Sequence, residues 1–88
     1  MKLKESKPHT YIRETNAKTN YIIQSCESLE QLTSASKWTR LLWSMWRKKL
    51  TFKGVIDTED GEMLIALMSQ HHKSILRKQL EIETLNNY

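Results

Sequence analysis

Residues 28–50 read SLEQLTSASKWTRLLWSMWRKKL, and this stretch decides the fold. It opens on a capping box, in which Ser28 accepts a hydrogen bond from the third backbone N–H and Gln31 reaches back. At about 100° per residue, the apolar residues that follow share one arc of about 160°. Those residues are Leu32, Ala35, Trp38, Leu42, Trp43, Met45, Trp46 and Leu50. The pattern predicts one long amphipathic helix over residues 28–50, with Trp38 and Trp46 buried.

A second long helix is predicted over residues 58–84. Its start is acidic, with Glu59, Asp60 and Glu62, where the helix dipole favours negative charge. Its apolar residues recur at helical spacing, in a central stripe of Leu64, Leu67, Met68, His71, Ile75 and Ile82 and a flank of Ile65, Leu76 and Leu80. The connection contains Gly54, a residue typical of a tight turn. The two helices should therefore form an antiparallel hairpin.

The segment that precedes the hairpin is more polar. Residues 1–18 are rich in Lys, Thr and Asn and include Pro8, so they are predicted to form a flexible arm. Tyr21, Ile22 and Ile23 predict a short helix over residues 19–26. Each of the two long helices has an apolar arc too wide to be covered by the other helix alone. Either the segment around residues 21–23 packs across them as a third element, or two hairpins pair into a four-helix homodimer. The expected fold class is all-α in both cases.

Length and composition set further limits. The chain has 88 residues and a formal net charge of +4, which indicates one small basic domain. Its one cysteine, Cys26, excludes an intrachain disulfide and favours a cytoplasmic location. The first residues do not resemble a secretory signal. No stretch approaches the roughly 18 apolar residues that a membrane span needs, so no membrane partner is expected.

The candidate site is a basic stripe on the first long helix. Residues 31–56 contain no acidic side chain, and Lys37, Arg40, Ser44, Arg47 and Lys48 recur there at helical spacing. Their cationic ends could contact phosphates or an acidic protein. Trp43 lies at the edge of the apolar arc, and Trp and Arg are enriched in interface hot spots. The alternative is that the stripe binds nothing and is simply a solvated face, partly neutralised by the acidic start of the second helix.

No catalytic or metal-binding pattern is present. His71 and His72 are adjacent, so on a helix they diverge by about 100° and do not chelate one ion. Cys26 cannot be matched with a histidine base, and a small buried residue is the ordinary reading. The two glycines, Gly54 and Gly61, form no phosphate-binding loop. The sequence therefore predicts neither an enzyme nor a cofactor, and His71 is expected to line the bundle.

The stretch Ile23-Gln24-Ser25-Cys26-Glu27-Ser28-Leu29-Glu30-Gln31-Leu32, followed by Ala35 and Trp38, resembles small uncharacterised helical-hairpin proteins of phages and mobile elements in gut anaerobes. The resemblance implies no activity. It is compatible with an accessory or inhibitory protein in the bacterial cytoplasm that acts by binding. The function expected is stoichiometric binding of a protein partner through Lys37, Arg40, Trp43, Ser44, Arg47 and Lys48, and an acidic partner would suit these cations. The alternatives are nucleic-acid binding through the same stripe, and a structural assembly subunit.

Overall fold

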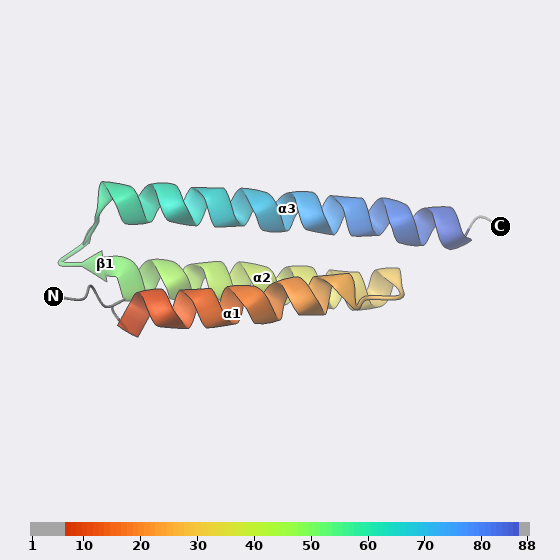
Figure 1. Cartoon of the computed structure of the whole chain (residues 1–88), viewed down its shortest axis with the longest axis horizontal. Coiled ribbons are helices and arrows are strands. Elements are labelled where there is room, and N and C mark those ends of the chain that lie inside the picture. Colours follow the sequence, from red (N-terminus) through yellow and green to blue (C-terminus); the bar gives the residue numbers. More distant parts are fainter. Residues whose placement is uncertain (1–6, 87–88) are drawn as a thin grey trace, which may run out of the picture.

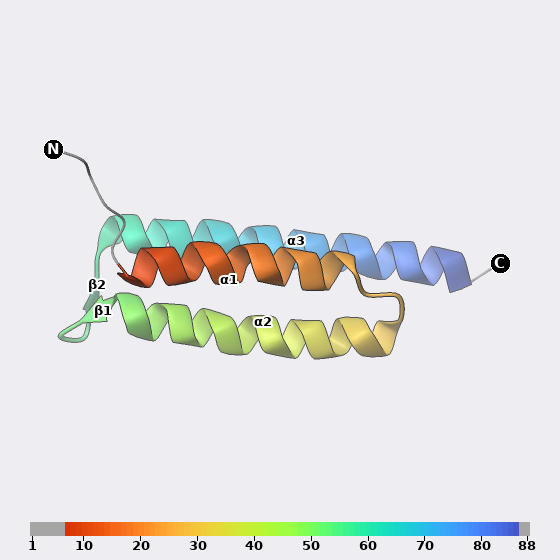
Figure 2. The same ribbon diagram turned by 60° about the horizontal axis from the view of Figure 1, so that its bottom comes forward.

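The computed structural model describes residues 7–86, and within them the chain folds into three long helices and a small β-ribbon. Helices α1 (Lys7–Gln24), α2 (Leu29–Leu50) and α3 (Thr58–Asn86) lie side by side along the long axis (Figure 1). Strands β1 (Thr51–Phe52) and β2 (Val55–Ile56) connect α2 to α3. Each helix is antiparallel to the one before it, as the view in Figure 2 makes clear. The predicted all-α fold is confirmed.

Helix α2 begins where the capping box predicts. Ser28 is the N-cap residue, and its Oγ accepts the backbone N–H of Gln31 at 3.1 Å. The Gln31 side chain reaches back one residue further than expected, because its Oε1 accepts the N–H of Glu27 at 2.7 Å. At the other end, Arg47, Lys48 and Lys49 occupy the last turn, where the helix dipole favours cations. The predicted bounds of 28–50 therefore agree with the structure.

The first helix corrects the sequence prediction. The flexible arm predicted over residues 1–18 is wrong for residues 7–18, which belong to α1, while residues 1–6 lie outside the described residues. The short helix predicted over residues 19–26 is the last part of α1. Ile12, Thr19 and Ile23 recur at spacings of one and two turns, and all three are buried. Pro8 lies in the first turn, where a missing N–H breaks no intrahelical bond.

The core consists of two clusters of buried residues, one toward each end of the bundle. The first contains Ile12, Leu42, Trp46, Leu50 and Leu64, and the second contains Ile23, Cys26, Leu32, Ala35 and Ile82. Every helix contributes to both clusters. Helix α1 is thus the third element that covers the apolar arcs of α2 and α3. Formation of a homodimer stays a prediction.

Hydrogen bonds from all three tryptophans of the chain join α2 to its neighbours. The bonds run from Trp38 Nε1 to Thr19 Oγ1 at 3.3 Å, from Trp46 Nε1 to Thr15 Oγ1 at 2.9 Å, and from Trp43 Nε1 to His71 Nδ1 at 2.9 Å. The two threonine hydroxyls in turn donate to carbonyl oxygens within α1, Thr15 to Tyr11 and Thr19 to Thr15, both at 2.7 Å. These polar residues can therefore lie against the core, because their hydrogen bonds are made within the bundle.

The connection between α2 and α3 is a two-residue β-turn. Thr51 pairs with Ile56 and Phe52 with Val55, which leaves Lys53 and Gly54 at the turn. Both have positive φ, 52° for Lys53 and 79° for Gly54, as the turns that suit antiparallel strands require. Ile56 packs against the first core cluster, so the turn fixes how α3 begins relative to α2.

Candidate binding surface

The outer face of α2 carries the predicted basic stripe. The buried residues of this helix are Leu32, Ala35, Thr39, Leu42, Trp46 and Leu50, and they face α1 and α3. The cations and the serine of the stripe are turned away from that face, and Lys37, Arg40, Ser44, Arg47 and Lys48 are all exposed. The stripe is therefore a solvent-exposed surface on a rigid helix.

Within residues 7–86, the acidic start of α3 forms no ion pair with the stripe. Asp60 instead interacts with α1, where its Oδ1 lies 2.9 Å from Nε2 of His9. Lys49 also turns toward α1, with its Nζ 4.7 Å from the centre of the Tyr11 ring. Within residues 7–86, none of the four cations of the stripe forms an ion pair with a carboxylate. Their positive charge remains available to a partner.

Trp43 is only half-buried, but its contacts lie inside the protein. Its ring stacks on that of His71, with 6.0 Å between ring centroids and 11° between planes. Its indole N–H is already used in the hydrogen bond to His71 Nδ1. A partner could therefore contact only the exposed carbon atoms of the Trp43 ring, not its N–H. The role of Trp43 as an anchor stays a prediction.

Three apolar side chains on α2 are exposed, and two of them, Trp38 and Met45, lie in the arc that the sequence pattern predicts to be covered. The exposed fractions are 66% for Leu41, 43% for Met45 and 37% for Trp38. Trp38 was expected to be buried, but the covered arc of α2 is shifted and is centred near Thr39 and Leu42. Spacings of three and four residues make the exposed residues neighbours on the helix surface. We call them the apolar line; Leu41 lies within one turn of both Lys37 and Ser44.

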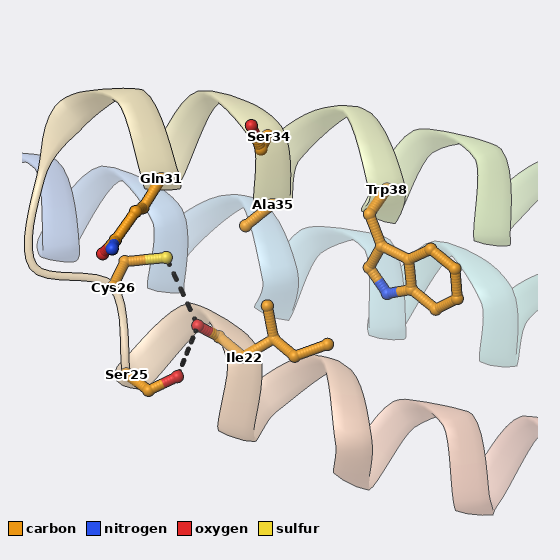
Figure 3. Close-up of a pocket in the computed structure, with 7 residues that line it drawn as sticks. All are labelled: Ile22, Ser25, Cys26, Gln31, Ser34, Ala35 and Trp38. Carbon is orange, nitrogen blue, oxygen red and sulfur yellow. Dashed lines mark hydrogen bonds between the residues drawn. The ribbon is translucent and has the colours of Figure 1, made fainter.

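The apolar line ends at an open cleft between α2 and the end of α1. The cleft has a volume of about 430 Å³ and is lined by Ile22, Ser25, Cys26, Gln31, Ser34, Ala35 and Trp38. Figure 3 shows Trp38 at one end of the cleft and Cys26 at the other. An apolar side chain that contacts Leu41 could therefore continue past Trp38 into this cleft.

The Cys26 side chain in this cleft favours the protonated thiol over the nucleophilic thiolate. Its Sγ donates to the carbonyl oxygen of Ile22 at 3.3 Å, the longer of the two dashed lines in Figure 3. Burial raises the pKa of the Cys26 thiol, and the positive charge of Lys78 only partly opposes this effect. The thiolate that a reactive cysteine needs is therefore disfavoured.

Three further findings concern the identity of the protein. No protein-family model matches the chain, and no curated protein or solved structure matches it significantly. Within residues 7–86, no group of three or more His, Cys, Asp or Glu side chains is placed to hold a metal ion. The helices in the same range lack the combined length and apolar character that crossing a bilayer requires.

Proposed function

We propose that this protein acts by stoichiometric binding of an acidic protein partner through the outer face of α2. The observation that supports the proposal is the apolar line of Trp38, Leu41 and Met45, which lies beside Lys37 and Lys48. Interfaces combine an apolar centre with a polar rim, and this face has both parts. The resemblance to small uncharacterised helical-hairpin proteins of phages and mobile elements is compatible with the same mode of action.

The chemistry of the surface suggests the kind of partner. Apolar side chains of the partner would cover Leu41 and Met45, and one of them would enter the cleft beside Trp38. Carboxylates of the partner would lie toward Lys37 and Lys48. An amphipathic acidic helix fits these demands, because its apolar residues recur at the spacing of the apolar line.

The apolar line favours a protein over a nucleic acid as the partner. A phosphate backbone would use the cations of the stripe, and its affinity would fall steeply with salt. It would leave Leu41 and Met45 without apolar contacts, and removal of apolar surface from water is the main favourable term in most protein association. Nucleic-acid binding is therefore the alternative outcome of the test below.

Affinity capture from a lysate of the source organism tests the proposal. The tagged chain should retain one acidic protein, and nuclease treatment should not release it. The double variant Leu41→Ala/Met45→Ala should weaken the complex by about 2 kcal/mol, which is roughly thirtyfold in Kd. Lys37→Glu/Lys48→Glu should abolish retention. Isothermal calorimetry with the captured protein measures both effects.

Two control variants match these changes on other faces. Lys18→Glu/Lys73→Glu makes the same change in charge at exposed residues of α1 and α3, and Leu80→Ala removes an exposed apolar side chain of α3. Both should bind as the unmodified protein does. If nuclease releases all bound material, and the Leu41→Ala/Met45→Ala variant binds normally, the partner is a nucleic acid and the proposal is wrong.

A further inference from the structure

His71 is a buried titratable residue that the proposed binding surface does not use. It lies in α3, is fully buried, and contacts both other helices. Its Nε2 is 2.6 Å from Oδ1 of Asn16 in α1, and its Nδ1 is 2.9 Å from Nε1 of Trp43 in α2. Its ring also lies 5.7 Å from that of Trp46, at a tilt of 48°. One imidazole thus joins all three helices.

These contacts define the protonation state of His71. The indole N–H of Trp43 can only donate, so Nδ1 of His71 must accept and carries no proton. The proton of the neutral ring is then on Nε2, which donates it to Asn16 Oδ1. Both ring nitrogens are satisfied in this tautomer and in no other. The folded protein therefore requires the neutral imidazole.

We propose that His71 makes the packing of the bundle sensitive to pH, because protonation of its ring breaks the contact between α2 and α3. A proton added at Nδ1 would point at the indole N–H of Trp43, so two donors would face each other. The ring would also carry a charge inside the core, where the desolvation of an ion is costly. Trp43 must then leave its stacked position, and the contact that joins the three helices is lost.

The groups around the ring give a protonated His71 no compensating partner. Asn16 faces it from α1 and Trp43 and Trp46 face it from α2, and the residues one turn away in α3 are Leu67, Met68, Ser74 and Ile75. All of these are neutral. The cleft that Asn16 lines is also lined by His9 and Arg13 of α1. Within residues 7–86, no carboxylate forms a hydrogen bond or ion pair with the ring.

The direction of the pH effect follows from linkage. Burial lowers the pKa of His71 below its ordinary value of 6.5, so the unfolded chain takes up a proton more readily than the folded protein. The stabilising contribution is therefore complete above pH 6.5 and is lost as the pH falls toward the lowered pKa. Across that window, the equilibrium constant for unfolding should rise by up to about tenfold per pH unit, as the uptake of one proton requires.

Urea unfolding between about pH 7.5 and about pH 5, above the range in which most carboxylates titrate, tests the proposal. The double variant His9→Gln/His72→Gln leaves His71 as the sole histidine of the full chain. It also removes the contact between His9 and Asp60. This variant should lose stability with the slope of one proton as the pH falls. Adding His71→Gln should abolish the slope.

A second measurement keeps the test valid if His71→Gln does not fold. Proton NMR of the double variant follows the ring signals of His71 directly during the same titration. They should remain those of a neutral ring in the folded protein as the pH falls below 6.5. The proposal is overturned if His71 titrates at or above that pH while the protein stays folded. It is also overturned if the stability of the double variant does not change across the window.

Discussion

Replacing Trp46 by alanine is expected to lower the free energy of unfolding by about 3–5 kcal/mol, the usual cost of removing a buried aromatic ring. Trp46 is fully buried in the first core cluster, packs against His71, and bonds to Thr15 of α1. Small domains have stabilities near the lower end of about 5–15 kcal/mol. The variant should therefore be largely unfolded, and circular dichroism during urea unfolding would measure the loss.

Trp38→Ala is the matched control for this change. Trp38 lies on the same helix and also bonds to a threonine of α1, but 37% of it is exposed. Its replacement should cost only about 1 kcal/mol, in the ordinary range for a partly exposed residue. Trp46→Phe should fall between the two, because it keeps a ring in the core and leaves Thr15 bonded to the Tyr11 carbonyl. Equal losses for both alanine variants would contradict this description of the core.

Replacing Ile12 by alanine is expected to cost about 2–5 kcal/mol, although this residue lies in a segment that the sequence places in a flexible arm. The Ile12 side chain is 2% exposed and packs with Leu42, Trp46 and Leu64 in the first core cluster. Its removal leaves a cavity where all three helices meet. A fall in the urea midpoint at unchanged slope would show that the loss is one of stability.

Glu14→Ala is the control for Ile12→Ala. Glu14 lies half a turn further along α1 and is exposed, so its replacement should change stability by less than about 0.5 kcal/mol. The pair of variants separates burial of α1 from its helical propensity, because alanine is the better helix former in both cases. If Ile12→Ala is as harmless as Glu14→Ala, α1 does not pack as the structure shows.

Helices α2 and α3 could be predicted from the sequence because their local signals agree. Ser28 and Gln31 mark the start of α2, and apolar residues recur along one face of it. Gly54 marks the turn, and Glu59 and Asp60 mark the start of α3. Each signal depends on residues close together in the chain, so no knowledge of the tertiary structure is needed.

Most of helix α1 could not be predicted because its packing face is largely polar. Ile12 and Ile23 are its buried apolar residues, and Thr15, Asn16 and Thr19 lie between them. Those side chains are compatible with the interior only because Trp46, His71 and Trp38 meet them with hydrogen bonds. The partners are 19 to 55 residues away in the sequence, so periodicity cannot find them.

The candidate site could be predicted in part. Lys37, Arg40, Ser44, Arg47 and Lys48 are exposed on one helix, as their spacing indicates. The contact of Trp43 with His71 depends on how α3 is aligned with α2, which local patterns do not encode. The exposure of Trp38 and Met45 follows from the shift of the covered face toward Thr39, a residue that a count of apolar side chains omits.

Amide hydrogen exchange of the full chain tests most directly whether three helices form one cooperative bundle. The amides of α1 between residues 12 and 23 should exchange as slowly as the central amides of α2, because global unfolding is needed to expose them. The residues at the β-turn should exchange much faster. Fast exchange throughout α1, with slow exchange kept in α2 and α3, would show a two-helix hairpin with a mobile arm and would contradict the three-helix bundle.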